Sequence, residues 1–418
     1  MPQPTPAPAE TELPRFPLAR GCPFDPPAEY AAMRADQPVT RVRMPSGQDA
    51  WLVTRHEDVR RLLTDPRVSA DREHPNLPLT EAVTPAGRRA IAAVGRSLIG
   101  LDPPEHGARR GMLITEFTVR RINTLRPYVQ GVVDGLVDDL LAGPRPVDLV
   151  AALCLPVPSM VLCELLGVPY ADREFFQHRA TVQVRRGVAP EERQKAGAEL
   201  RSYLDRLITE KEANPGDDLL GRLIVRNREA ATDDDGGGAS PFDHDLLVGL
   251  AMLLMAAGHE STANMISLGV AGLLENPDQL SAIMSDPAAI PMAMEELLRY
   301  FAIVDTMPRV AKADIEVGGV SVPAGDGLLI GFASANRDES VFPNPDTLDV
   351  RRGARHHVAF GYGVHQCIGQ NLARAEMEIV FRTLFARIPG LKLAVPLHEL
   401  PFKDDSSVYG LDRLPVTW

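Results

Sequence analysis

Cysteine is scarce in this chain, whose 418 residues include only Cys22, Cys154, Cys163 and Cys367. No two of them form a Cys-x-x-Cys pair, so the spacing argues against a disulfide framework and against a zinc site built on paired thiolates. Cys154 and Cys163 lie in apolar runs and are expected to be buried as small hydrophobic residues. This use of cysteine is typical of a reducing, intracellular compartment.

Positive charge is not in excess either. The chain has 44 Lys and Arg against 56 Asp and Glu, a formal net charge of -12, which does not favour a nucleic-acid partner. Met1–Pro17 lacks an apolar segment and is rich in proline, alanine and glutamate, unlike a signal peptide or a membrane anchor. We therefore expect a cytoplasmic protein with no membrane partner, in which residues 1–20 form a mobile, proline-rich leader.

Helical periodicity dominates the rest of the sequence. The composition, 44% hydrophobic and 24% charged, is ordinary for a globular protein with a sizeable core. Apolar residues recur at helical spacing over 57–63, 123–141, 158–166 and 198–208. The clearest strand patterns are short, at 50–54 and at 315–317 before Gly318-Gly319. These patterns predict a mainly α-helical protein with a small β region.

The longest predicted helix begins at an N-cap, Asp243, and runs to Leu274, where Asn276-Pro277 ends it. Its middle, 246–257, is apolar almost all round, which is typical of a helix buried in a core. A transmembrane span is the alternative. His259 and Glu260 argue against it, because a carboxylate at the centre of a bilayer is costly.

The most informative segment is 360–369, Phe-Gly-Tyr-Gly-Val-His-Gln-Cys-Ile-Gly. It places the Cys367 thiol among three glycines, directly before a predicted helix. A thiolate is a soft ligand for iron if it is kept deprotonated and shielded. Glycines allow positive φ, so that amide N–H groups can face the sulfur, and the helix from Ile368 onward adds its positive end.

Two other interpretations apply to this segment. Cys367 could be an inert, buried cysteine in a glycine-containing turn. Zinc is a second alternative, because His356, His357 and His365 lie nearby in the sequence. However, one thiol with irregular histidine spacing does not match the paired ligands of structural zinc sites.

The spacing Phe360-Gly361-x-Gly363-x-His365-x-Cys367-x-Gly369 resembles the haem-binding signature of the cytochrome P-450 superfamily. The resemblance extends from about residue 20 to the C-terminus. It implies a single domain, 21–418, folded as a triangular, mainly helical prism around a buried haem b. It also implies that the haem iron is bound by Cys367 and that the haem contacts Phe360, Gly361, His365 and Gly369. The segment 233–240, whose composition alone would suggest a domain boundary, becomes a surface loop.

A second motif lies inside the long helix, at Ala257-Gly258-His259-Glu260-Ser261-Thr262. Gly258 costs about 1 kcal/mol relative to alanine in a helix, and small residues such as Ala257 and Gly258 would let a flat macrocycle approach the backbone. Hydroxyls here can bond to the i−4 carbonyl and open the helix locally. The segment resembles the acid–alcohol motif of the family, with Glu260 as the acid and Ser261 where threonine is commoner. Which of Ser261 and Thr262 is the working alcohol stays open, and a weak point in a core helix is the alternative.

Other segments of the sequence match parts of the family that support the haem. Glu296 and Arg299, at i and i+3, would ordinarily be a surface pair, but in the family such a pair is buried with a second arginine, here Arg352 rather than Arg351. We expect this triad to be structural. The resemblance assigns the haem propionates to His106, Arg110, Arg309 and His365.

The resemblance implies a monooxygenase that inserts one atom of O2 into a C–H bond by hydroxylation or epoxidation. Two electrons would come from NAD(P)H through a ferredoxin reductase and a ferredoxin. The enzyme would be a monomer that acts in secondary metabolism or antibiotic biosynthesis. The ferredoxin would dock on a basic surface that includes Arg109, Arg110, Arg120, Arg121, Arg355 and Arg374. A haem-binding sensor or carrier and a peroxide-driven oxygenase are alternatives, and neither needs the acid–alcohol motif.

The substrate is expected to be a mainly hydrophobic small molecule, such as a polyketide, a macrolide, a sterol-like compound or a drug. By analogy with the family, the pocket is lined by segments 72–97, 170–188, 250–257, 303–306 and 406–408. The wall residues that we predict are all apolar: Leu253, Ala256, Ile303, Val304 and Val408. An apolar wall would hold its ligand by shape, with few polar contacts.

Overall fold

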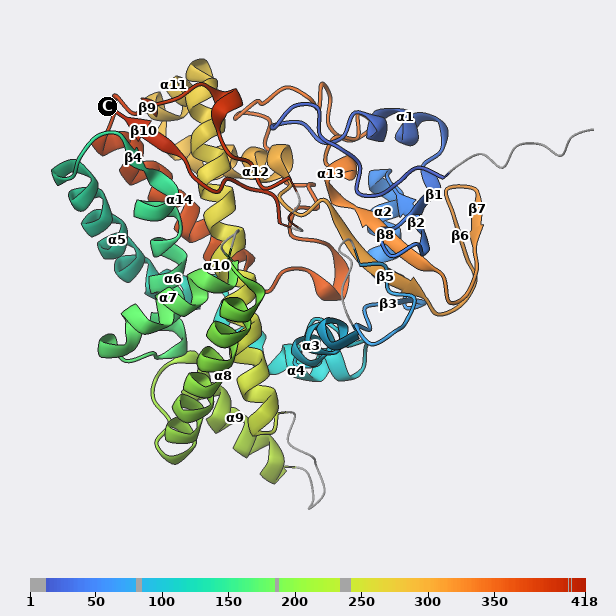
Figure 1. Cartoon of the computed structure of the whole chain (residues 1–418), viewed down its shortest axis with the longest axis horizontal. Helices are drawn as coiled ribbons and strands as arrows, with labels where there is room; N and C mark the ends of the chain where they lie inside the picture. Colours follow the sequence, from blue (N-terminus) through green and yellow to red (C-terminus); the bar gives the residue numbers. More distant parts are fainter. Residues whose placement is uncertain (1–12, 80–84, 185–187, 234–241, 405, 407) are drawn as a thin grey trace, which may run out of the picture.

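The computed structural model describes residues 13–79, 85–184, 188–233, 242–404, 406 and 408–418. Helices make up most of the described chain (Figure 1). They are α1 (Glu29–Asp36), α2 (His56–Thr64), α3 (Pro85–Gly95), α4 (Glu105–Ile114), α5 (Val119–Ala142), α6 (Pro156–Leu166), α7 (Arg173–Val184), α8 (Pro190–Ala213), α9 (Leu219–Asp233), α10 (His244–Glu275), α11 (Pro277–Ser285), α12 (Ile290–Phe301), α13 (Phe332–Ala335) and α14 (Gln370–Arg387). The predicted mainly helical fold with a small β region is confirmed.

The strands gather mostly on one side of the molecule, as Figure 1 shows. They are β1 (Val39–Arg43), β2 (Asp49–Val53), β3 (Val68–Ser69), β4 (Val147–Asp148), β5 (Thr306–Ala311), β6 (Ile315–Val317), β7 (Val320–Val322), β8 (Gly327–Gly331), β9 (Lys392–Leu393) and β10 (Pro415–Thr417). The largest sheet has the order β1-β2-β8-β5-β3. In it β2 pairs with β8 in parallel, with Trp51 opposite Leu328, so strands from the two ends of the sequence lie side by side.

Helix α10 crosses the whole helical part of the molecule in Figure 1 and packs against α6, α8, α12 and α14. The predicted boundaries are confirmed: the Asp243 carboxylate accepts a hydrogen bond from the Leu246 N–H at 2.8 Å, and α11 begins at Pro277. Among the described residues it is the one helix long and apolar enough to cross a membrane, but 61% of its most apolar window is buried in the fold. It is therefore a core helix.

Two boundaries differ from what the sequence predicted. Residues 13–20 were expected to belong to a mobile leader, but Phe16 is 3% exposed and its N–H donates to the Arg43 carbonyl at 2.9 Å. The leader prediction is wrong for these eight positions because Phe16 buries apolar surface against the sheet. Of the predicted surface loop at 233–240, Asp233 ends α9 and the other positions lie outside the described residues.

Candidate active site

Cys367 lies in a tight loop that leads into α14. Its N–H donates to the Phe360 carbonyl at 2.8 Å, which closes the loop. Gly361 and Gly363 have φ of +69° and +72°, the left-handed conformation that glycine adopts without strain. A side chain at Gly363 would also collide with the backbone, because its Cβ would lie 2.5 Å from the Leu63 oxygen. Two of the three glycines around the thiol, Gly361 and Gly363, are therefore required by the backbone path.

The Cys367 side chain has accessible surface although protein surrounds it on most sides. It therefore faces a space within the fold. Burial raises the pKa of its thiol, and this effect outweighs the opposing ones. The opposing groups are the backbone N–H groups of Gly369 and Gln370 and the guanidinium groups of Arg110 and Arg374, all of which favour the thiolate. Donors therefore already converge on the sulfur, and a metal ion bound to it would keep it deprotonated.

The other cysteines have different surroundings. Cys154 and Cys163 are buried, as predicted, and burial raises the pKa of Cys163 to about 12. Cys22 is exposed and free. Within the described ranges, no group of three or more His, Cys, Asp or Glu side chains is arranged to hold a metal ion. A single sulfur ligand beside a cofactor agrees with this pattern better than a zinc cluster does.

The four basic side chains that the resemblance assigned to haem propionates come together beside Cys367. The rings of His106 and His365 lie 4.1 Å apart between their centres. The Arg110 guanidinium donates to the Gln366 carbonyl at 2.7 Å, and Arg309 is buried at 6% exposure. Three separate segments of the chain thus bring basic side chains to one place.

Within the described part of the chain, Arg110 and Arg309 donate to backbone carbonyls, and no ion pair joins the four basic groups to a carboxylate. Burial lowers the pKa of His365 to about 3, with Arg309 and His106 acting in the same direction. Burial also lowers the pKa of Arg309 to about 10, and Arg72 contributes by repulsion. The nearby carboxylate, Asp102, is already bonded to Ser69, to the Ala70 N–H and to Lys312. The cluster is therefore an electropositive site suited to two anionic groups.

Arg72 belongs to this cluster and was not predicted as a haem contact. Its stem packs so closely that a Cβ on Gly95 or Gly100 would lie 2.7 or 2.6 Å from its Cγ. Its Nε is buried and makes no hydrogen bond within the described structure. The sequence carries no signal for it, because Arg72 stands in no motif and follows a two-residue strand.

Helix α10 has an accessible face in its middle, although most residues on either side of it along the helix are buried. Ala256 and Ala257 are exposed there, between the buried Met255 and His259. The Ser261 hydroxyl donates to the Ala257 carbonyl at 2.6 Å, the predicted bond to residue i−4. The helix nevertheless stays α-helical over its whole length, so the expected local opening is absent. Thr262 is 5% exposed, so Ser261 is the hydroxyl on the accessible side.

Gly258 has a different surrounding from the one expected. A Cβ at this position would meet the Leu162 side chain of α6, with its nearest atom at 3.3 Å. The glycine thus allows α6 and α10 to pack closely. The accessible small residues are the two alanines, Ala256 and Ala257, rather than Gly258.

Glu260, the predicted acid, is held by a residue that the sequence did not reveal. The Lys403 ammonium donates to Glu260 Oε1 at 3.0 Å and to Asn264 Oδ1 at 2.9 Å. Lys403 is buried, at 6% exposure, and lies 143 positions from Glu260 in the sequence. No local pattern could have identified it.

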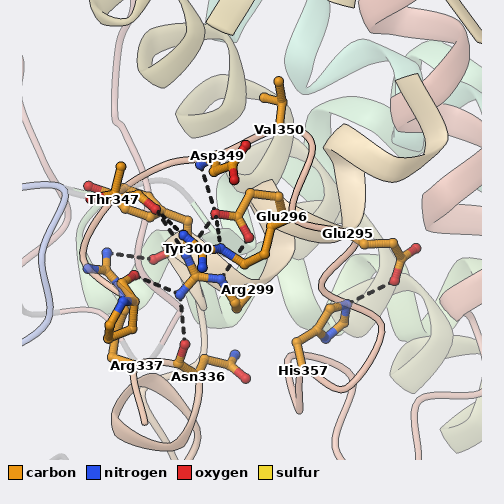
Figure 2. A network of polar contacts seen from close by, with 12 residues as sticks. Glu295, Glu296, Arg299, Tyr300, Asn336, Arg337, Thr347, Asp349, Val350 and His357 are labelled. Atoms are coloured by element: carbon orange, nitrogen blue, oxygen red, sulfur yellow. Dashed lines mark hydrogen bonds and ion pairs between the residues drawn. The ribbon is translucent and has the colours of Figure 1, made fainter. Parts of the chain in front are cut away.

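The predicted structural triad is assembled, and Figure 2 shows its Glu296–Arg299 pair. Arg299 donates through Nε and Nη2 to both Glu296 oxygens, at 2.7 and 2.8 Å, and both side chains are fully buried. Arg352 donates to Glu296 Oε1 at 3.1 Å, whereas Arg351 is exposed. Arg299 also donates to the Asn336 and Pro345 carbonyls, so one guanidinium ties α12 to the segment before the loop.

A second acidic residue beside the triad supports the cysteine loop and was not predicted. Glu295 accepts from His357 at 3.0 Å, as seen in Figure 2, and from Arg374 Nε at 2.6 Å. Burial alone would raise the pKa of Glu295, but these hydrogen bonds outweigh it and lower that pKa to about 2. The Arg374 guanidinium in turn lies over the Phe360 ring, 4.6 Å from its centre.

The predicted substrate wall is divided. Leu253 and Ile303, at 5% and 9% exposure, are packed in the core, so the structure does not place them on an open surface. The backbone of Ile303 is also tied to the C-terminal segment, because its carbonyl accepts from the Tyr409 N–H at 2.7 Å. Ala256 is exposed, and Val304 and Val408 are half-buried.

The predicted basic docking surface is also divided. Arg120 and Arg355 are exposed, and Arg110 is half-buried at the propionate cluster. The others are in ion pairs: Arg109 with Glu105, Arg121 with Glu116, and Arg374 with Glu295. Paired arginines carry less free positive charge toward a partner.

Together these residues fit iron protoporphyrin. A sulfur ligand faces a space in the fold, and basic groups that form no ion pair with a described carboxylate lie beside it in sufficient number for two propionates. The accessible face of α10 is formed by alanine and serine, which leave room. This donor set matches thiolate-ligated haem chemistry.

Comparison with known proteins gives a consistent answer. The family model "Cytochrome P450" matches residues 284–388. The chain is 48% identical to cytochrome P450 105A3 of Streptomyces carbophilus, covering 97% of this chain and 96% of that one. It is 46% identical to the vitamin D3 dihydroxylase of Streptomyces griseolus, covering 98% of each chain. The crystal structure of cytochrome P450 MoxA from Nonomuraea recticatena is similar with a TM-score of 0.89 and 52% identity, covering 97% and 98%.

Proposed function

This chain belongs to the cytochrome P450 family, and on that basis we propose that Cys367 binds the iron of its haem b and that Glu260 and Ser261 deliver the protons of its reaction. The protein is a monooxygenase of hydrophobic metabolites. The reaction takes a C–H bond, O2, two electrons and two protons to an alcohol and water. When bound, the haem supplies the activation of O2 through its thiolate-ligated iron.

The observation that carries the cofactor assignment is the environment of Cys367. Backbone N–H groups of Gly369 and Gln370 and the Arg110 guanidinium favour the thiolate form. His106, Arg110, Arg309 and His365 would bind the propionates, and Arg72 joins them because it lies within reach of Arg309. In this arrangement Cys367 would hold the iron, and the basic cluster would hold the propionates.

The proton-delivery assignment follows from the accessible face of α10. The Ser261 hydroxyl can accept and donate a hydrogen bond through the same atom, Oγ. In this structure it donates to the Ala257 carbonyl. Glu260 lies next to it in the chain and keeps 17% of its side chain accessible. A carboxylate and a hydroxyl in this order can carry a proton from solvent to the reacting oxygen. The pair therefore favours an O2-dependent enzyme over a haem sensor, a carrier or a peroxide-driven oxygenase.

The substrate is a largely hydrophobic small molecule, of the polyketide, macrolide, sterol-like or drug class, held by shape. Support comes from the apolar residues that remain accessible, Ala256, Val304 and Val408. The relative named vitamin D3 dihydroxylase acts on a molecule of this character. Apolar walls with few polar groups are the usual design of such sites.

Electrons reach the site from redox partner proteins. We assign this role to a ferredoxin and its NAD(P)H-dependent reductase, docking on the side of the cysteine loop where Arg120 and Arg355 are exposed. The enzyme works as a monomer in the cytoplasm, and the absence of a disulfide among the described cysteines agrees with a reducing compartment.

The reduced protein under carbon monoxide tests the cofactor assignment. The wild-type protein should show the red-shifted Soret band that thiolate ligation gives, and Cys367→Ala should lose both that band and turnover. Cys22→Ala is the matched control, because it removes an exposed thiol outside the site and should change neither. A wild-type protein without the band, or a fully active Cys367→Ala variant, would contradict the proposal.

A further inference from the structure

Lys403 is the least expected charged residue in the fold. Its side chain is 7% exposed, and a lysine is seldom buried to this degree unless it is paired. It stands at the base of the C-terminal loop between Phe402 and Leu411, where its N–H donates to the Gly410 carbonyl at 3.0 Å and Phe402 pairs with Leu411 in a β-bridge. The backbone of Lys403 is thus fixed on the loop, and its side chain reaches α10.

The Lys403 ammonium contacts two successive turns of α10. It donates to Glu260 Oε1 at 3.0 Å and to Asn264 Oδ1 at 2.9 Å. The Asn264 amide is itself oriented, because its Nδ2 donates to the Val408 carbonyl at 3.2 Å. One ammonium therefore links the acid of the proton-delivery pair to the C-terminal loop through a fixed amide.

The surrounding backbone leaves space for this contact. A Cβ at Gly410 would lie 2.2 Å from Asn264 Cγ, so glycine is required there for the amide to take its position. The neighbouring titratable group on α10, His259, is neutral at pH 7: burial lowers its pKa to about 4, and the Lys403 charge acts in the same direction. Among the described residues, Glu260 is the one carboxylate that pairs with Lys403.

We propose that Lys403 is a positioning residue for proton delivery, which holds the Glu260 carboxylate at the place from which it serves Ser261. This rests on the proposed function of Glu260 and Ser261. Each turnover consumes two protons, and Glu260 must return to the same position after passing each one. When the carboxylate is displaced, electrons from NAD(P)H are lost as hydrogen peroxide, by O2 plus two electrons plus two protons. Lys403 therefore favours hydroxylated product over peroxide.

The test compares Lys403→Met with Lys403→Arg, using product formed and peroxide released per NAD(P)H consumed. Lys403→Met should lower the product yield by about tenfold, below the full effect of removing a general acid, and raise peroxide release in parallel. Lys403→Arg, which keeps a cation, should recover most of the yield. Asn264→Ala, which keeps the ion pair but removes its second anchor, should have a smaller effect in the same direction.

Lys211→Met is the matched control, because Lys211 is also buried and its ammonium pairs with Asp218 at 2.5 Å rather than with Glu260. It should leave the product yield unchanged. An independent measurement is the urea midpoint of Lys403→Met, of Glu260→Gln and of the double variant. If the two side chains stabilise the fold only through their contact, the double variant should have the same urea midpoint as the less stable single variant. Independent contributions would lower the midpoint further.

The outcomes distinguish the positioning role of Lys403 from the proposed function of the enzyme. If Lys403→Met keeps the carbon monoxide band and wild-type product yield, or if Lys211→Met loses as much yield, the positioning role is wrong while the enzyme assignment stands. If Lys403→Arg recovers nothing although it folds and binds haem, the role of the cation is also wrong. A wild-type protein that binds no haem would instead overturn the proposed function itself.

Discussion

Two adjacent hydroxyls, on Ser261 and Thr262, compete for one role in α10. The Ser261 hydroxyl lies on the accessible side and donates to the Ala257 carbonyl at 2.6 Å, whereas Thr262 is packed at 5% exposure. Serine lacks the second branch that stiffens threonine, so its hydroxyl can leave that carbonyl and turn toward the reacting oxygen. The difference in environment gives the two residues different expected functions.

We therefore predict that Ser261→Ala raises peroxide release per NAD(P)H more than Thr262→Ala does. The first substitution removes a hydroxyl from the proton path, and the second removes one from the helix packing. Measurement of product and peroxide in the same reaction distinguishes them. Equal yields of product in both variants would remove Ser261 from its assigned role.

Glu295 gives a prediction about pH. Its hydrogen bonds from His357 and Arg374 outweigh burial and lower its pKa from 4.5 to about 2. A group with a lowered pKa stabilises the folded state above its unfolded pKa, and this contribution is lost as the pH falls from about 4.5 toward about 2. Such a shift corresponds to about 3 kcal/mol.

Glu295→Gln should thus lower the free energy of unfolding at neutral pH by about 2–3 kcal/mol and make the loss of stability below pH 4.5 less steep. Urea unfolding over a pH series measures both effects. Glu316→Gln, at an exposed position of β6, is the control and should change neither. A parallel shift of the whole pH curve would show that Glu295 acts by packing and not by its charge.

At the scale of elements, the triad ties α12 to the segment 343–352 that precedes the cysteine loop. Arg352 donates to Glu296 and to the carbonyls of Pro343, Asn344 and Thr347. Because Glu296 is fully buried, losing one partner leaves part of its charge uncompensated. The effect should reach the haem, since this segment leads directly into the loop.

Arg352→Ala should lower the free energy of unfolding by about 3 kcal/mol and weaken haem retention. The adjacent Arg351→Ala is the matched control, because Arg351 is exposed, and it should stay within about 0.5 kcal/mol. Thermal unfolding and the haem absorbance after gel filtration report the two effects. Similar losses in both variants would show that the sequence match to Arg352 carries no special role.

At the scale of the whole molecule, the net charge of -12 contrasts with a proposed docking face that carries Arg120 and Arg355. Local positive charge can attract an acidic ferredoxin even on an acidic protein, but salt screens it over about 10 Å at 0.1 M and about 3 Å at 1 M. Raising the ionic strength should therefore slow reduction of the enzyme several-fold.

Arg355→Gln should slow reduction at low salt and flatten its salt dependence. Lys392→Gln, at an exposed cation of β9, is the control and should do neither. Stopped-flow reduction by a ferredoxin measures both variants. A rate indifferent to ionic strength would mean that electrostatic steering plays no part in docking.

The sequence was sufficient for features that depend on neighbouring residues. The ends of α10 were predicted because Asp243 caps the helix and Asn276-Pro277 stops it, and the cysteine loop was predicted because its glycines are close in sequence. Lys403 and Arg72 could not be predicted, because each acts on residues far along the chain and neither belongs to a motif. Leu253, a predicted wall residue, is 5% exposed, and apolarity in the sequence does not distinguish a lining residue from a core residue.

The parallel pairing of β2 with β8 determines when this enzyme can finish folding. Trp51 lies opposite Leu328, and its indole N–H donates to Asp326, 275 positions later, at 2.9 Å. While the chain emerges from the ribosome, β1 and β2 must wait with an unpaired edge until most of the polypeptide has been made. Such late, long-range contacts slow folding and leave an intermediate prone to aggregation. Slower translation and chaperone supply should therefore raise the yield of active enzyme in a foreign host.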